Sequence, residues 1–465
     1  MVYSITSKRL VQIATAFGSS LAPFMVGAII VAAPTIGDDF SADVALLGWL
    51  TAAFFLVAAA CLVPFGRIAD VKGAKRVFTA GLGIYVASAL LAALSPDIYI
   101  LILARALTGV GAAMIFGTSI ALLGLVFAPE ERGKAIGINV TAMFIGFTLG
   151  LLAGGFLSYY ISWRGIFLIV AIVAAVDLTI VLTRLKGECE LVRAKGYDLV
   201  GMALYGGGMI LTFYGLSQID TLLGVGSVIL GGAVMLAFVR WEKRQPYPLI
   251  NKMVSGDARL RLAMLTNILF QGGSFAIPFT LSLYLQYVSE LDSRYASFIL
   301  IIPQTLMIAL GPVSGKLSDR WSSPMVAAMG CVMNVFGLLL VVGIGENTSI
   351  VQTVMALLFI GAGTAFFMPA VLNWGLKRIP RGDFGVASAF TETSRLAGMT
   401  FSNAVIIIVF SVILGGETVN EGNIPEFLTA VQMIFALFLI LTLIGMGLAL
   451  LGRRRSRMEG VDTKA

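Results

Sequence analysis

Four charged side chains lie inside long apolar stretches of this sequence, where a charge carries a free-energy cost. They are the acids Asp177 and Glu392 and the arginines Arg105 and Arg395. At the centre of a bilayer such a charge costs at least ~2.5–3.5 kcal/mol, so it normally faces protein or water rather than lipid. A carboxylate in such a place can take up a proton or attract a cation, and an arginine can neutralise it. These residues are therefore the first candidates for chemistry.

Glu392 and Arg395 are three residues apart, so they share one face of a helix. Two interpretations remain open. In the first, the pair neutralises itself, which makes its burial tolerable. In the second, it is a proton or substrate site, in which the state of the carboxylate depends on whether Arg395 is engaged.

Asp177 also allows two interpretations. It lies about seven residues from the end of its apolar segment, which is roughly 10 Å along a helix. It can therefore reach the interface, where water or lipid head groups would solvate it. The alternative is a role in proton or substrate binding.

The elements that must position these residues are apolar segments. Hydrophobic residues make up 58% of the chain and charged residues 12%, and the mean hydropathy is +0.95. No soluble fold could bury so much apolar surface beneath so few charges. A membrane-spanning helix needs about 20 apolar residues, so we predict an all-α integral membrane protein. We expect fourteen spans, at about 10–34, 45–66, 76–95, 98–127, 133–160, 164–184, 198–217, 222–240, 262–288, 296–315, 325–344, 349–376, 384–414 and 427–451.

The basic residues support this number of spans because they alternate between the two sides of the membrane. Of the 32 lysines and arginines, 28 fall on one side, Arg164 and Arg294 fall on the other, and two lie within spans. Basic residues accumulate on the cytoplasmic side of membrane proteins. We therefore expect a multi-pass protein of the cell membrane with both termini in the cytoplasm. The net charge of +7 then faces anionic lipid, and no aromatic-interleaved basic domain suggests a nucleic-acid partner.

The composition excludes several kinds of site. The sequence has no histidine, which excludes His-ligated metals, His-held haem and His-based acid–base chemistry. Cys61, Cys189 and Cys331 are far apart and form no CxxC motif. We therefore expect no metal and no cofactor. A membrane enzyme would need clustered His, Cys or Asp ligands, which are missing.

A short charged loop occurs twice, each time between two apolar segments. The first copy contains Gly66, Asp70, Gly73, Lys75 and Arg76, and the second contains Gly315, Asp319 and Arg320. Counted from residues 10 and 262, Asp70 lies 60 residues into the first block and Asp319 lies 57 into the second. Spans one to six therefore correspond to spans nine to fourteen, and spans seven and eight are an insertion. We expect a six-helix bundle with its linker at 1–197, the inserted helices with a linker at 198–261, and a second bundle with a cytoplasmic tail at 262–465.

With these features the chain resembles the major facilitator superfamily, and within it the 14-span drug:proton antiporter family. The first loop matches the family motif G-x-x-x-D-x-x-G-x-[RK]-[RK], and the second is a shortened copy. The resemblance implies two pseudo-symmetric six-helix bundles plus two inserted helices. It also implies that the loop latches the two halves in the outward-open state. For Arg105, in an R-x-x-x-G motif that ends at Gly109, it implies proton coupling; the alternative is a structural hydrogen-bond donor to backbone carbonyls.

Glycines in span five are expected to form a packing surface. Gly146, Gly150 and Gly154 recur every four residues and line one helix face, where small residues let helices approach closely. With Gly155 they resemble the antiporter motif G-P-x-x-G-G, although Leu151 stands in place of its proline. Further candidates for lining a cavity are Thr51, Phe54, Asn267, Gln271 and Asn373.

The resemblance implies a secondary active transporter, not an enzyme, that exports small organic compounds of the multidrug type by alternating access, coupled to protons. Its expected partners are a small-molecule substrate, protons and the lipid bilayer, and we expect a monomer. The family often has an acid in span one, but here Met25 takes its place, counted back from Pro34. A second interpretation is therefore an exporter or facilitator of an anionic or neutral metabolite, such as a vitamin or a sugar.

Two further classes fit less well. A non-transporting membrane sensor would need a soluble signalling domain, and we find none in this sequence. An ion channel is disfavoured because a duplicated latch suits a carrier that moves.

Overall fold

The computed structural model of the chain describes residues 8–127, 129–185, 198–218, 221–245, 258–376 and 384–458. The regular structure in these ranges is helical, and fourteen helical segments are long and apolar enough to cross a membrane. This confirms the predicted all-α membrane fold and the number of spans.

The first eight spans are single helices: α1 (Lys8–Phe40), α2 (Val44–Lys72), α3 (Ala74–Ala93), α4 (Ile98–Val126), α5 (Pro129–Tyr160), α6 (Arg164–Arg184), α7 (Leu199–Ser217) and α8 (Leu222–Glu242). The last four spans are also single helices: α14 (Ser323–Val341), α15 (Ile350–Leu376), α16 (Phe384–Leu414) and α17 (Ile424–Met458), with the short η2 (Glu421–Asn423) before α17.

Spans nine and ten are interrupted, which the sequence analysis did not predict. Span nine consists of α10 (Ala258–Gly272) and α11 (Ile277–Tyr287), and span ten consists of α12 (Ser293–Leu300) and α13 (Ile302–Arg320). A proline lies in the first turn of both α11 and α13, where its missing N–H costs least. In span nine, the backbone N–H of Ala276 donates to the Ser402 hydroxyl at 3.1 Å, which satisfies a donor that the interruption frees.

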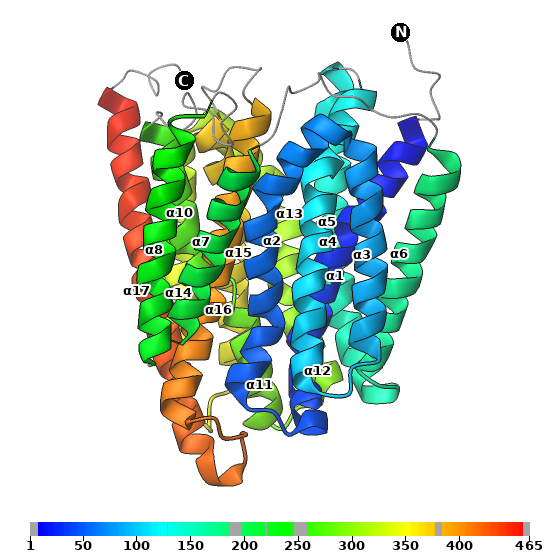
Figure 1. The fold of residues 1–465 in the computed structure, drawn as a ribbon. Helices are drawn as coiled ribbons and strands as arrows, with labels where there is room; N and C mark the ends of the chain where they lie inside the picture. Colours follow the sequence, from blue (N-terminus) through cyan, green and yellow to red (C-terminus); the bar gives the residue numbers. More distant parts are fainter. Residues whose placement is uncertain are drawn as a thin grey trace. The chain divides into compact units, whose positions relative to one another are not determined.

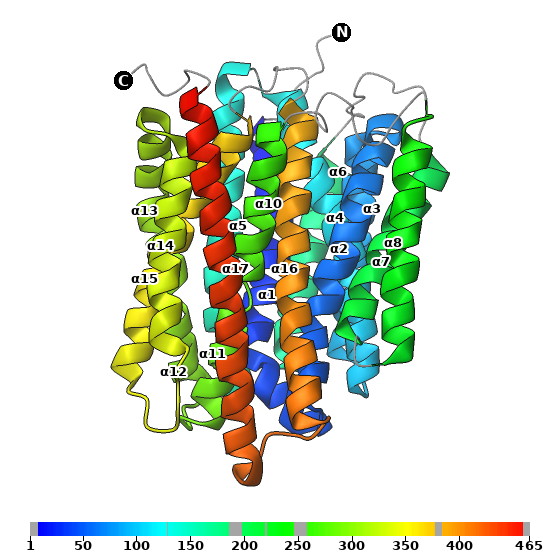
Figure 2. The ribbon, with the colours of Figure 1, turned by 90° about the vertical axis from the view of Figure 1, so that its left-hand side faces the viewer.

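The chain divides into two compact units. The first comprises Met1–Ala42 and Trp49–Leu249, and the second comprises Asp43–Gly48 and Ile250–Ala465. Within the first unit, α3 packs against both α4 and α6, and these helices lie side by side in Figure 1. Within the second unit, α10 packs against α16 and α17, which Figure 2 shows as neighbouring helices.

The inserted helices α7 and α8 form a tightly packed hairpin in the first unit. A Cβ placed on Gly215 would lie 2.6 Å from the Gly224 carbonyl oxygen, and one on Gly231 would lie 2.6 Å from the Thr212 nitrogen. The helices therefore approach each other at backbone distance. The hairpin contacts α2 through the Tyr205 hydroxyl, which donates to the Ala59 carbonyl at 3.4 Å.

The glycines of α5 pack against α1, as the sequence predicts for a small-residue face. A Cβ on Gly146 would lie 2.6 Å from the Ser20 carbonyl oxygen, and those on Gly150 and Gly154 would collide with the carbonyls of Phe24 and Ala28. The contact between α1 and α5 is the most extensive between two helices in the described residues. It holds α1 in place along much of its length.

We predict that Gly150→Ala destabilises the protein, because its methyl group would meet the Phe24 carbonyl. Overpacking of this kind costs about 1–3 kcal/mol. The matched control is Gly137→Ala on the same helix, where a Cβ meets no atom within 4 Å. Thermal unfolding in detergent measures the stability of both variants. Equal melting temperatures for the two would contradict the packing account.

Candidate functional site

Glu392 and Arg395 form an ion pair on α16, in the geometry that their spacing allows. The Arg395 Nε donates to Glu392 Oε1 at 3.0 Å and to Oε2 at 2.9 Å, and the terminal Nη2 also donates to Oε1. The side chains remain 34% exposed for Glu392 and 19% for Arg395. The two charges therefore neutralise each other, but the pair remains partly accessible from outside the protein.

Helix α10 supports the segment that carries this pair. The Asn267 side-chain amide donates to the Ser394 hydroxyl at 2.9 Å and to the Thr391 carbonyl at 3.2 Å. Its other amide atom, Oδ1, is buried without a hydrogen-bond partner. Asn267 thus bonds to the backbone of Thr391 before Glu392 and to the side chain of Ser394 after it, and still offers one acceptor.

Gln271 lies one turn along α10 from Asn267, and a glycine of α16 makes room for it. A Cβ on Gly398 would lie 2.7 Å from the Cβ of Gln271 and 2.7 Å from the Ile268 carbonyl oxygen. The Gln271 side-chain amide donates weakly to the Met368 sulfur at 3.7 Å. Asn267 and Gln271 of α10 therefore contact the helix that carries Glu392 and Arg395, at Thr391, Ser394 and Gly398.

Asn373, the remaining cavity candidate of that unit, belongs to a different cluster. Its side-chain amide donates to the Ser318 hydroxyl at 3.0 Å, next to the second charged loop. This bond ties α15 to α13.

Arg105 is fully buried in the first unit, and only some of the hydrogen-bond donors of its guanidinium group have partners there. Its Nε donates to the Leu50 carbonyl at 3.0 Å, and its guanidinium carbon lies 4.7 Å from the centre of the Phe54 ring. Among the described residues, neither terminal nitrogen has a hydrogen-bond partner, and neither does the buried hydroxyl of Tyr85, with which Arg105 interacts electrostatically. Thr51 is also buried in this unit. The structure thus brings Phe54 to Arg105, as a cation–π partner.

Asp177 does not reach the interface. It is 1% exposed, and both carboxylate oxygens are buried without a hydrogen-bond partner in the described residues. The interpretation that water or lipid head groups solvate it is therefore wrong. On α6 it belongs to a buried stripe that includes Val170, Ala174 and Val181. The buried face of α6 cannot be recognised from the sequence, because the lipid-facing side of the helix is equally apolar.

The first charged loop contains a tight turn and an ion pair. Gly73 has φ of 99°, a backbone conformation that favours glycine, and it precedes α3, whose first turn carries Lys75 and Arg76. The Asp70 carboxylate lies 3.7 Å from the Arg67 guanidinium on the same helix, so Asp70 has a basic neighbour. A Cβ on Gly66 would meet no atom within 4 Å, whereas a Cβ on Gly117 of α4 would lie 3.5 Å from the Gly66 nitrogen.

The second charged loop lies at the end of α13. A Cβ on Gly315 would meet no atom within 4 Å, and Arg320 is the last residue of the helix. The side chain of Asp319 lies outside the described residues.

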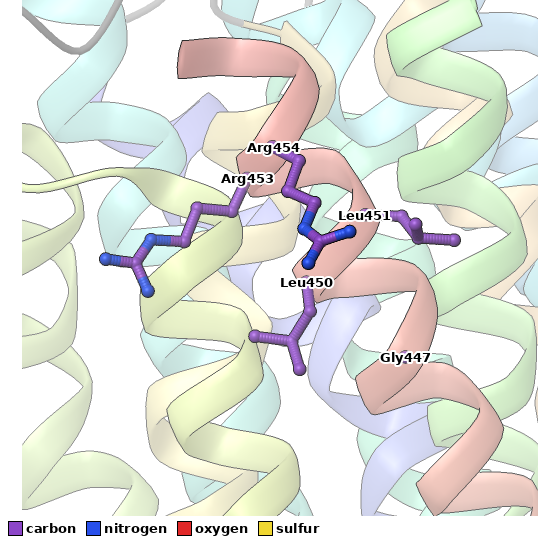
Figure 3. Close-up of a pocket in the computed structure, with 5 residues that line it drawn as sticks. All are labelled: Gly447, Leu450, Leu451, Arg453 and Arg454. Carbon is purple, nitrogen blue, oxygen red and sulfur yellow. The ribbon is translucent and has the colours of Figure 1, made fainter. Parts of the chain in front are cut away.

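A surface pocket of about 360 Å³ is lined by Gly447, Leu450, Leu451, Arg453 and Arg454 of α17 (Figure 3). None of these residues was predicted as part of a site. Figure 3 shows the Arg453 and Arg454 side chains extending in different directions from one helix, so their charges do not converge on one point.

We predict that Glu392 and Arg395 are energetically coupled. Replacing either partner alone leaves a partly buried charge, whereas the double replacement leaves none. The Glu392→Gln/Arg395→Gln variant should lose less free energy of unfolding than the two single variants lose together. The difference should be on the order of 1 kcal/mol for this partly exposed pair. Thermal unfolding of the four proteins measures the coupling. The exposed pair Lys8–Glu131 is the control, and an equally small coupling in both pairs would contradict the prediction.

Comparison with known proteins agrees with this architecture. Residues 15–403 match the family model described as Major Facilitator Superfamily. Among solved structures, a crystal structure of the peptide transporter POT in complex with sulfate superposes with a TM-score of 0.71 at 15% identity, covering 95% of each chain. That likeness shows the fold.

Two curated relatives match most of the chain. The multidrug resistance protein Stp of Mycobacterium tuberculosis is 27% identical over 89% of this chain and 79% of its own. The riboflavin transporter RibZ of Clostridioides difficile is 22% identical over 82% of this chain and 83% of its own. The family match covers more than three quarters of the sequence and agrees with the fourteen helices, so this chain is a multi-pass membrane protein that belongs to the Major Facilitator Superfamily of transporters.

Proposed function

We propose that this transporter exports small organic compounds in exchange for protons by alternating access. The observation that carries the proposal is the Glu392–Arg395 pair, a partly exposed ion pair within a membrane-spanning helix. The similarity to Stp, a protein named for multidrug resistance, supports export of foreign compounds.

The pair can couple proton uptake to export of the compound, because its net charge changes when either a proton or a cationic compound binds. With both side chains ionised the pair is neutral. A proton on Glu392 removes the partner of Arg395, and so does a cationic compound that takes over the carboxylate. Each ligand therefore competes with Arg395 for the same carboxylate, and proton and cation exclude each other. Exchange of one for the other follows from this competition.

The remaining candidates have supporting roles in this proposal. Arg105 assists coupling in the first unit. The loop with Gly66, Asp70, Gly73 and the basic pair Lys75 and Arg76 acts as the latch on the cytoplasmic side. Both termini lie in the cytoplasm, as the distribution of basic residues favours, and the protein acts in the cell membrane as a monomer.

We predict that Glu392→Gln removes the dependence of transport on a pH gradient, because glutamine cannot exchange a proton. The measurement is ethidium transport in proteoliposomes with and without an imposed pH gradient. The control is Glu346→Gln, which removes an exposed acid outside the helices. Unchanged pH dependence in Glu392→Gln would remove Glu392 from the mechanism.

A second candidate function is transport of an anionic or neutral metabolite. The observation that favours it is Arg105, whose terminal nitrogens and neighbouring Tyr85 hydroxyl lack partners in the first unit. Unpaired buried donors of this kind suit an oxyanion. RibZ, a relative named as a riboflavin transporter, shows that a protein of similar sequence carries a vitamin.

Under this second function, an organic anion such as salicylate should stabilise the wild-type protein and not Arg105→Gln. Ligand at a hundred times its dissociation constant stabilises a protein by about 2.7 kcal/mol, which thermal unfolding detects. Arg294→Gln, which removes an arginine outside the buried cluster, is the control. Stabilisation by ethidium alone, retained in Arg105→Gln, would favour the first function instead.

A further inference from the structure

Asp177 is a buried carboxyl group that the exchange at Glu392 does not use. It lies on α6, which packs against α3, α1 and α5 within the first unit (Figure 1). At 1% exposure it is shielded from water and from lipid alike. Neither of its oxygens accepts a hydrogen bond from a described residue.

The neighbours that the structure shows against this carboxyl group are a glycine backbone and an apolar ring. A Cβ built on Gly18 of α1 would lie 3.2 Å from Asp177 Oδ2 and 2.8 Å from Phe78 Cζ of α3. The carboxyl group therefore lies against the bare backbone of α1 at Gly18 and beside the Phe78 ring. Gly18 is required here, because a side chain would fill the space that the carboxyl group and the ring share.

None of the charged side chains that the structure describes on the neighbouring helices bonds to Asp177. The titratable side chains that the structure describes on these helices are Lys8, Arg9, Asp38 and Asp39 on α1, Lys75, Arg76 and Tyr85 on α3, Glu131, Tyr159 and Tyr160 on α5, and Arg164 and Arg184 on α6. None of them bonds to Asp177. Lys8 pairs with Glu131 and Arg164 pairs with Asp39, so two of these cations are engaged elsewhere.

An ionised carboxylate without a partner is strongly disfavoured in such surroundings, whereas the protonated form loses far less solvation when it is buried. We therefore propose that Asp177 is a second proton-binding site, and that it carries its proton in the conformation described here. The proton is held by exclusion of water rather than by a basic partner. It can leave only when α6 separates from α1 at Gly18 and water reaches the carboxyl group.

This site differs from Glu392 in how it is controlled. Glu392 is 34% exposed and ion-paired, so its proton competes with a salt bridge. Asp177 is sealed and unpaired, so its proton responds to helix separation. Its use in a transport cycle rests on the proton-coupled exchange proposed above, whereas its protonation in this conformation does not.

Infrared spectroscopy tests the protonation directly, because a protonated carboxyl group has a C=O stretch that an ionised one lacks. We expect purified protein in liposomes at neutral pH to show this band, Asp177→Asn to lose it and Glu392→Gln to retain it. Gly18→Ala should shift its frequency, because the new methyl group would press against the carboxyl group. A band that persists in Asp177→Asn, or no band in the wild type, would overturn the proposal.

Isotope labelling makes the test independent of whether Asp177→Asn folds. Wild-type protein that contains carbon-13 aspartate should show the band shifted, and protein with carbon-13 glutamate should show it unchanged. The reverse pattern would assign the proton to a glutamate and refute the proposal. Because the readout is not transport, a failure of proton-driven export would leave a positive infrared result standing.

Discussion

An ionised side chain inside a membrane-spanning helix must be neutralised by an opposite charge, by polar groups or by a proton. The structure meets this constraint in three ways. Glu392 has the guanidinium of Arg395. Arg105 has one backbone carbonyl and the face of an aromatic ring, which leaves its terminal nitrogens unmatched. Asp177 has no partner, and for it we propose a proton. In the exchange we propose, charge moves because these arrangements change when a ligand binds or a helix moves.

Close helix packing places these groups where they are. The glycines of α5 let α1 lie against it at backbone distance, and Gly18 of the same α1 leaves room for the carboxyl group of Asp177. In the second unit, Gly398 lets α16 approach α10, so that Asn267 can bond to the residues on both sides of Glu392. Glycine thus does more than allow helices to associate, since it determines which polar atoms are buried and with what neighbours.

The sequence predicted the spans well because a bilayer demands about 20 apolar residues for each helix, and loops carry the charges. It also predicted the Glu392–Arg395 pair and the small-residue face of α5, because both depend on spacing along a single helix. It missed the interruptions near Pro278 and Pro303, because each segment has the overall length and hydropathy of one continuous span, although Gly272, Gly273 and Ser274 lie at the first interruption. It gave the wrong surroundings for Asp177, since burial between helices cannot be distinguished from lipid exposure when every face is apolar. The roles of the site residues depend on how the protein moves, which spacing does not encode.

The central claim is that substrate and proton compete for the carboxylate of Glu392. Its most direct test is to titrate the purified transporter with ethidium in weakly buffered solution, and to follow ethidium binding by fluorescence and released protons with a pH-sensitive dye. At a pH low enough to protonate Glu392 and free it from Arg395, the account predicts that protons are released in proportion to the ethidium bound, and that Glu392→Gln reduces this release. Saturable ethidium binding that releases no protons would contradict it.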